Sequence, residues 1–159
     1  FERTLISSNS KFDKYSRGEE VFTTSELNGF AIFNSEKGDC FHCHGTSLFT
    51  DNLFHNNGLE SEPFLDLGLG KITENTSDNG KFKTPTLRNI EVSAPYMHDG
   101  RFSTLEEVIE HYDSGGHFSS TVDPLMKKLG VGLNLTNQEK SDLIAFLKTL
   151  TDYDYITAE

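Results

Sequence analysis

Two cysteines and a histidine form the most chemically specific pattern in this sequence. Residues 40–44 read Cys-Phe-His-Cys-His, the C-x-x-C-H pattern that attaches a c-type haem. In such a motif the thiols of Cys40 and Cys43 bond to the two haem vinyl groups, and His44 gives the iron its proximal imidazole. The chain contains no other cysteine, so no disulfide remains to be made. We therefore predict one covalently bound haem c.

A C-x-x-C pair also occurs in redox dithiols and in zinc sites. A zinc site would need more ligands at regular spacing, and both His42 and His44 are too cramped beside Cys43 to complete a tetrahedral set. A thioredoxin-like dithiol follows a strand and precedes a helix, whereas glycine and polar residues flank this motif on both sides. The surrounding sequence therefore favours haem attachment over both alternatives.

The composition limits the classes of partner. The chain has 25 acidic and 14 basic residues, for a formal net charge of −11, and no basic stripe that would neutralise nucleic-acid phosphates. An acidic surface could attract a basic electron carrier, although scattered charges more often just solvate a surface. No apolar stretch approaches the roughly 20 residues that span a bilayer. We predict neither a nucleic-acid partner nor a membrane span.

Helical periodicity and capping residues predict three helices, over residues 25–34, 104–113 and 137–151. Ser103 and Glu106 have capping-box spacing at the start of the second helix. A helix, the haem motif, a long connection and a terminal helix follow one another as in a cytochrome c domain. The expected fold class is therefore mainly α, a cytochrome c-like domain with long haem-wrapping loops.

Residues 45–80 are rich in Asn, Gly, Asp and Ser and carry little periodicity, so we expect a long wrapping loop with a hairpin or turn near residues 67–70. The first and last helices of such a domain cross closely, often through a glycine that faces an aromatic ring. Gly29 and Phe146 are the candidates for this contact, because a glycine inside a helix permits close approach.

The chain divides into two expected parts. Residues 1–23 read as an irregular lead-in segment from a preceding domain, and residues 24–159 read as the haem domain. The chain begins abruptly with an apolar stretch over residues 1–6 and with Phe rather than Met, so we expect a processed chain or a fragment. Haem c is attached after export, which predicts a periplasmic or otherwise exported protein.

Residues 82–116 read FKTPTLRNIEVSAPYMHDGRFSTLEEVIEHYDSGG. This stretch closely resembles the C-terminal haem domain of bacterial di-haem cytochrome c peroxidases and the related MauG enzymes, and residues 1–13 resemble the segment that enters that domain. The resemblance covers nearly the whole chain. It implies an electron-transfer domain that works with a second haem domain or subunit and with a small electron-carrier protein.

The chain also departs from this family. It has one C-x-x-C-H and no tryptophan, whereas the family has two haem domains and commonly places a tryptophan between the haems. In the family, peroxide is cleaved at the haem of the N-terminal domain, which this chain does not resemble. The resemblance therefore implies no catalytic residue in this chain, which by itself should not be an efficient peroxidase.

Three residues compete for the sixth position on the iron. Met97 lies at a spacing that an ordinary cytochrome c accepts, Tyr112 lies on the apolar stripe of the second helix, and Met126 serves either as a ligand or as a core residue. The resemblance implies Tyr112, because the family's axial residue lies seventeen positions after the proline that is Pro95 here, and MauG-type enzymes carry tyrosine there. Tyr112 is the first choice and Met97 the second. The alternative for Tyr112 is a core tyrosine with a hydrogen-bonded hydroxyl.

The resemblance further implies a Ca²⁺ held partly by the backbone carbonyls of Ser93 and Pro95, since hard cations bind oxygen. Arg88 and Arg101 are candidates for pairing with haem propionates, and His98 is expected near the distal side of the haem. Three further histidines are expected to be ordinary polar residues: His55, His111 and His117.

The sequence leaves three functions open. The leading one is an electron-transfer haem domain, the C-terminal half of a di-haem peroxidase or of a MauG-like oxidoreductase. The second is a free-standing mono-haem electron carrier in which Met97 binds the iron. The third is a small peroxidase with an open or labile sixth position.

Overall fold

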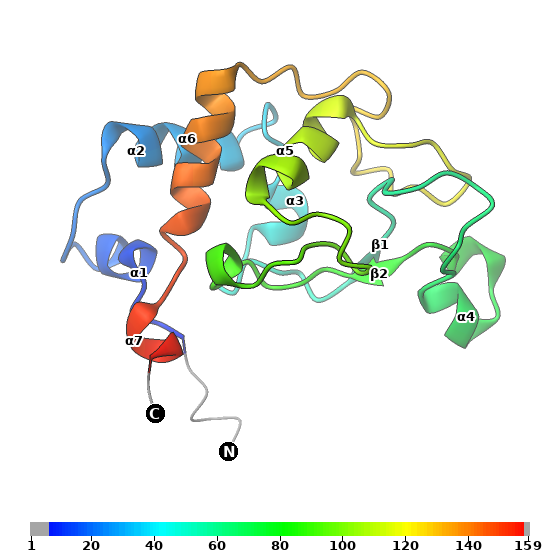
Figure 1. Cartoon of the computed structure of the whole chain (residues 1–159), viewed down its shortest axis with the longest axis horizontal. Helices are drawn as coiled ribbons and strands as arrows, with labels where there is room; N and C mark the ends of the chain where they lie inside the picture. Colours follow the sequence, from blue (N-terminus) through cyan, green and yellow to red (C-terminus); the bar gives the residue numbers. More distant parts are fainter. Residues whose placement is uncertain (1–6, 158–159) are drawn as a thin grey trace.

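The computed structural model describes residues 7–157, so the apolar start at residues 1–6 lies outside the described part of the chain. The helices are α1 (Lys11–Ser16), α2 (Thr24–Phe33), α3 (Phe41–His44), α4 (Leu69–Thr73), α5 (Leu105–Ser114), α6 (Asn137–Lys148) and α7 (Tyr153–Ile156), with two short 3-10 turns, η2 (Thr76–Asp78) and η3 (Ile90–Val92). Two strands, β1 (Phe54–His55) and β2 (Phe82–Lys83), form an antiparallel pair. The expectation of a mainly α domain is confirmed, and long irregular segments connect the helices (Figure 1).

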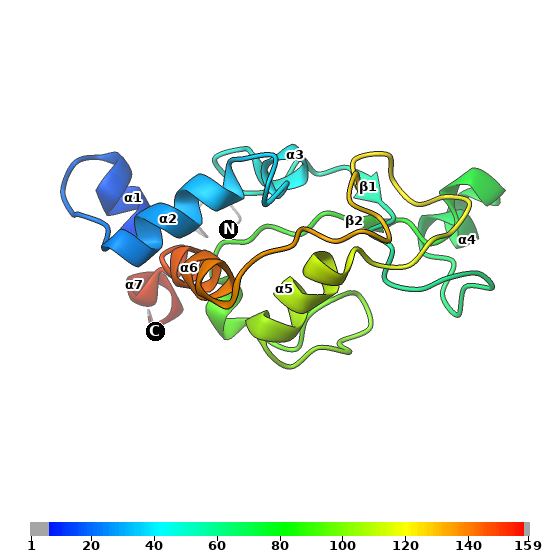
Figure 2. The same cartoon turned by 90° about the horizontal axis from the view of Figure 1, so that it is seen from above.

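Helix α2 crosses α6, and this crossing is the centre of the fold (Figure 2). A Cβ atom on Gly29 would overlap the backbone carbonyl of Asp142 and would lie 2.8 Å from the Cβ of Phe146. Only glycine therefore lets the two helix backbones approach this closely. Asp142 secures the same crossing because its carboxylate accepts hydrogen bonds from Ser25 and Asn28 of α2. The predicted contact between Gly29 and Phe146 is confirmed.

The first part of the chain is more ordered than we expected. Ser10 and Asp13 form a capping box, and α1 follows within the segment that the sequence analysis treated as irregular. The backbone N–H of Phe12 donates to the carbonyl of Thr149 at 2.9 Å, and the Phe12 ring lies 6.1 Å from the Phe146 ring. The expectation of an irregular lead-in over residues 1–23 is wrong for α1, a helix too short for periodicity to reveal.

The capping box of helix α5 lies one residue later in the chain than we expected. Thr104 has an extended backbone and accepts a hydrogen bond from the N–H of Glu107 at 3.2 Å, and these two residues form the capping box. Ser103 instead donates its backbone N–H to the Glu107 carboxylate at 2.7 Å. The prediction of Ser103 with Glu106 is therefore wrong by one position, because both pairs have the same spacing and only the backbone geometry distinguishes them.

Residues 45–80 contain more regular structure than the expected loop. Strand β1 pairs with β2 so that Phe54 faces Lys83 and His55 faces Phe82. Helix α4 begins at the turn expected near residues 67–70, after Gly68 at a φ of 54°. Figure 1 shows α4 at one end of the molecule, with α1 and α7 at the other end. The long connection therefore runs from α3, which carries the haem motif, to the end of the molecule where α4 lies.

An aromatic cluster fills the core where α1, α2 and α6 meet. Five rings pack against Phe146 with centroid separations between 5.1 and 6.4 Å. They belong to Phe12, Phe22, Phe30, Phe33 and Phe49. Phe49 is the one member that comes from the segment directly after the haem motif, so this core also positions the loop beside His44.

Within residues 7–157, no helix is long and apolar enough to cross a membrane.

Candidate functional site

Helix α3 places the three residues of the haem motif on a single helical turn. Cys40 is the N-cap residue, and its carbonyl accepts the N–H of His44 at 3.0 Å. Cys40 and Cys43 are three residues apart, and side chains at this spacing lie on one face of a helix. Both thiols are free and partly buried. The turn therefore presents two thiols side by side, as attachment to two vinyl groups requires.

Burial raises the pKa of the Cys40 thiol to about 12 and that of the Cys43 thiol to about 11, and neighbouring carboxylates add to the effect. Both thiols are therefore protonated at neutral pH. A redox dithiol depends on a thiolate with a lowered pKa, and buried thiols with a raised pKa are unreactive towards disulfides. The electrostatics of the motif thus argue against a redox dithiol and fit thioether attachment.

His44 has the orientation and protonation state that an iron ligand needs. Its Nδ1 lies 2.7 Å from the carbonyl oxygen of Phe49, and since a carbonyl can only accept, Nδ1 carries the proton. Burial lowers the pKa of His44, so the ring is neutral near pH 7. Its Nε2 therefore keeps a lone pair, and the hydrogen bond at Nδ1 fixes both tautomer and ring orientation.

Arg88 holds the loop that carries the Phe49 carbonyl. Its guanidinium lies 5.9 Å from the centre of the Phe49 ring and donates to the carbonyl of Ser47 at 2.9 Å. The same guanidinium forms two hydrogen bonds of 3.0 Å with the carboxylate of Asp13. Arg88 thus links α1 to the loop that orients His44. Its expected pairing with a haem propionate stays a prediction.

The structure brings the two leading candidates for the sixth ligand together. The amide Nδ2 of Asn57 lies 3.1 Å from the Tyr112 hydroxyl and 3.6 Å from the Met97 sulfur. Burial raises the pKa of Tyr112, and the hydrogen bond from Asn57 partly offsets this effect. The third candidate, Met126, lies on a separate turn where its N–H donates to Asp123.

Met97 lies at the tip of a tight loop. The loop is closed by the antiparallel bridge between Tyr96 and Phe102, in which the N–H of Tyr96 donates to Phe102 at 2.7 Å. Met97 itself has a φ of 71°, which is uncommon for a residue other than glycine. The surrounding bonds therefore hold the Met97 backbone in a conformation that a free chain would rarely adopt.

The remaining predicted site residues lie on or near the same loop, and their roles stay predictions. Ser93 and Pro95, the expected calcium ligands, are exposed. Arg101 pairs with Asp99 at 2.6 Å and donates to the carbonyl of Leu59 at 3.0 Å. His98 stacks on the ring of Phe82, with centroids 3.5 Å apart. Of the three histidines expected to be ordinary, His111 is buried and lies 3.2 Å from the carbonyl of Asn57.

A charged cluster beside Cys43 was not identified from the sequence. The Nδ1 of His55 lies 2.6 Å from the carboxylate of Asp123, and its Nε2 lies 2.7 Å from that of Asp51. Burial alone would lower the pKa of His55, but the hydrogen bonds to Asp123 and Asp51 outweigh burial and raise it. The backbone of Asp51 also donates to the carbonyl of Cys43 at 2.9 Å. His55 thus joins β1 to two loops beside the haem motif.

We expect His55→Gln to destabilise the protein more at about pH 5.5 than at about pH 8.5. A pKa raised on folding contributes stability that is fully present below the unfolded value of about 6.5 and is lost as the pH rises through the folded value. Denaturant unfolding of the wild type and the variant at both pH values measures this difference. In a background of Asp51→Asn and Asp123→Asn this pH dependence should be lost or reversed, because burial alone lowers the pKa of His55. An equal cost at both pH values would contradict the assignment.

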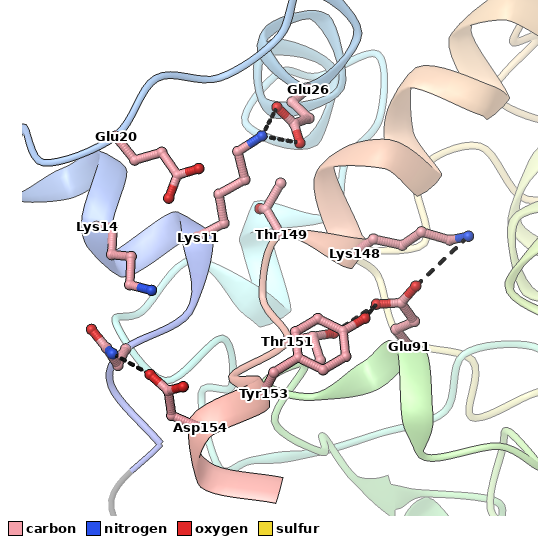
Figure 3. Close-up of a pocket in the computed structure, with 11 residues that line it drawn as sticks. Lys11, Lys14, Glu20, Glu26, Glu91, Lys148, Thr149, Thr151, Tyr153 and Asp154 are labelled. Carbon is pink, nitrogen blue, oxygen red and sulfur yellow. Dashed lines mark hydrogen bonds and ion pairs between the residues drawn. The ribbon is translucent and has the colours of Figure 1, made fainter. Parts of the chain in front are cut away.

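A hollow of about 310 Å³ lies among α1, η3 and the end of α6, away from the haem motif (Figure 3). Its charged groups largely pair with one another. Lys11 lies 2.8 Å from Glu26, Lys148 lies 3.8 Å from Glu91, and the hydroxyl of Tyr153 donates to Glu91 at 3.0 Å. None of the residues that line it belongs to the predicted haem site, and we assign it no function.

Comparisons with known proteins identify relatives over almost the whole chain. A family model described as cytochrome c matches residues 16–151. Cytochrome-c peroxidase IdrP1 of Pseudomonas sp. (strain SCT) is 36% identical over 95% of this chain and 47% of that protein. The methylamine utilization protein MauG of Methylophilus methylotrophus is 41% identical over 94% of this chain and 44% of that protein.

A solved structure has the same fold. The crystal structure of a MauG-like protein associated with microbial copper homeostasis matches 99% of this chain and 52% of that chain, with a TM-score of 0.91 and 38% identity. The expectation of a cytochrome c-like fold is confirmed. The chain spans less than half the length of these two curated relatives and about half the length of the solved chain.

Proposed function

Because this chain belongs to the cytochrome c family and is related to the cytochrome c peroxidases and MauG proteins, we propose that it transfers electrons through one covalently bound haem c, as the C-terminal domain of such an oxidoreductase. The observation that carries the proposal is the neutral His44 ring. Its Nδ1 donates to the Phe49 carbonyl, and its turn also carries two partly buried thiols.

Each side chain has a distinct role in this proposal. Cys40 and Cys43 would hold the haem through thioether bonds, and His44 Nε2 and the Tyr112 phenolic oxygen would be available to bind its iron. A haem bound here supplies an iron that gains and loses single electrons. An anionic oxygen ligand favours the ferric state and so lowers the reduction potential. The domain would then serve as a low-potential centre.

The wider setting follows from the same proposal. The partners are a second haem domain or subunit, where peroxide chemistry takes place, and a small electron-carrier protein. We assign the protein to the periplasm or another exported compartment, where haem c is attached. Ser93 and Pro95 would contribute backbone carbonyls to a Ca²⁺ site. The relatives' greater length supports a larger protein with a second domain.

We expect Tyr112→Phe to change the ferric haem spectrum of the full-length, haem-loaded protein and to raise its reduction potential. The substitution removes the phenolic oxygen but keeps the ring, so the iron loses its proposed anionic ligand. Absorption and electron paramagnetic resonance spectra, together with a redox titration, measure both effects. Met97→Leu is the matched control, which should leave the ferric spectrum unchanged.

An unchanged ferric spectrum in Tyr112→Phe would overturn tyrosine ligation. A spectrum that instead changes in Met97→Leu would support the second candidate, a mono-haem electron carrier. This second candidate has structural support because the Met97 sulfur and the Tyr112 hydroxyl both contact the Asn57 amide, which places the thioether beside Tyr112. A haem count on the intact natural protein, from its mass, tests the di-haem assignment: a single haem would overturn it.

A further inference from the structure

One amide contacts both candidate ligands of the iron. Asn57 Nδ2 lies within hydrogen-bond distance of the Tyr112 hydroxyl, at 3.1 Å, and of the Met97 sulfur, at 3.6 Å. An amide nitrogen carries two protons, so it can donate to both at once. The thioether sulfur has no proton to give, so the end of the amide that faces it must be the NH₂ group.

The backbone of Asn57 is held in place independently of its side chain. Its carbonyl accepts from His111, the residue before Tyr112 on α5, with 3.2 Å between the heavy atoms. On one side, the side chain of Asn56 donates to Ser119 at 3.0 Å, and on the other the carbonyl of Gly58 accepts from the N–H of His117 at 2.7 Å. A substitution at Asn57 therefore removes the amide and keeps these bonds.

We propose that Asn57 is the positioning residue that selects Tyr112 over Met97 as the sixth ligand. Its amide donates one proton to the phenolic oxygen and occupies a lone pair of the Met97 sulfur with the other. A hydrogen bond to a charged oxygen is much stronger than one to a thioether. The amide therefore stabilises the phenolate of Tyr112 more than it stabilises the free thioether of Met97. This inference rests on the proposed function, because it concerns the ligand of the same haem.

We expect Asn57→Leu to shift the ratio of tyrosine-ligated to methionine-ligated ferric haem by about tenfold or more towards methionine, since it removes a hydrogen bond to a charged acceptor and frees the sulfur. The full-length, haem-loaded protein is the sample. The sulfur-to-iron charge-transfer band and the electron paramagnetic resonance spectrum report the two forms. Adding Met97→Leu to this variant should remove the new sulfur band.

Asn57→Asp separates a hydrogen-bonding role from a steric one. Aspartate has the shape of asparagine, but in its ionised form it only accepts hydrogen bonds and repels a phenolate. If Asn57 acts through its donors, Asn57→Asp should also lose tyrosine ligation, whereas a purely steric role predicts wild-type spectra. Wild-type spectra in both Asn57 variants would overturn the inference.

The inference and the proposed function fail in different ways. If Tyr112→Phe alters the ferric spectrum and both Asn57 variants do not, tyrosine ligation stands and only the selecting role of Asn57 is lost. If Tyr112→Phe leaves the spectrum unchanged, tyrosine ligation fails, and the inference fails with it. Far-ultraviolet circular dichroism of each variant confirms that the fold is retained, as the backbone bonds of Asn57 lead us to expect.

Discussion

Alanine at both Cys40 and Cys43 is expected to abolish covalent haem attachment. Both thiols lie on the turn that carries His44, and no other cysteine exists in the chain to replace them. Haem staining after denaturing electrophoresis, with intact mass, measures attachment directly. The double variant should lose all covalent haem, and each single variant should keep at most one thioether bond.

The matched control for this prediction lies inside the motif. His42 occupies one of its two variable positions, which take no part in attachment, so His42→Gln should retain full attachment. Its ring lies 3.0 Å from the Asp39 carboxylate. His44→Gln should keep the thioether bonds but lose the proximal imidazole, which the ferric spectrum reports. Covalent haem in the double cysteine variant would contradict the assignment of the motif, and so would full attachment without spectral change in His44→Gln.

Gly29→Ala is expected to lower the free energy of unfolding by about 2 kcal/mol. The added Cβ would overlap a backbone carbonyl of Asp142, so the helices must separate, which puts the cost near the upper end, about 3 kcal/mol, of overpacking. Alanine regains about 1 kcal/mol through its higher helix propensity. Urea unfolding of the haem-loaded protein measures the difference.

Ala31→Ser, on the exposed side of the same helix, is the control and should change stability by no more than about 0.5 kcal/mol. The two variants together separate helix packing from helix propensity. A neutral or stabilising Gly29→Ala would mean that α2 and α6 move apart without cost. Such a result would contradict the close crossing as the centre of the fold.

The crossing also supports the haem site through the aromatic core. The Phe49 ring lies 6.4 Å from Phe146 of α6 and 6.0 Å from Phe33 of α2, while its carbonyl accepts from His44. Residues far apart in sequence therefore position one carbonyl oxygen. No periodicity or spacing identifies that oxygen, because it belongs to a backbone that any residue type would provide.

Local sequence patterns predicted the structural features that depend on the spacing of residues a few positions apart. The haem motif and the three long helices follow from fixed offsets, whereas the contact between Gly29 and Phe146 was expected from the element order of a cytochrome c domain and from a glycine inside a helix. Shorter elements escaped prediction, because α1 and α4 span too few residues for periodicity to appear. Capping boxes one residue apart were also indistinguishable until the backbone angles of Thr104 were known.

The sequence by itself determined that two cysteines and a histidine are spaced for haem attachment, because that chemistry depends on neighbours along one turn. Only the tertiary structure decided which side chains from distant segments meet one another. Asn57, Met97 and Tyr112 come from three separate segments, and His55 meets Asp51 and Asp123 across two loops. Such contacts depend on how distant segments of the chain pack together, and the packing of the core decides this rather than any local sequence pattern.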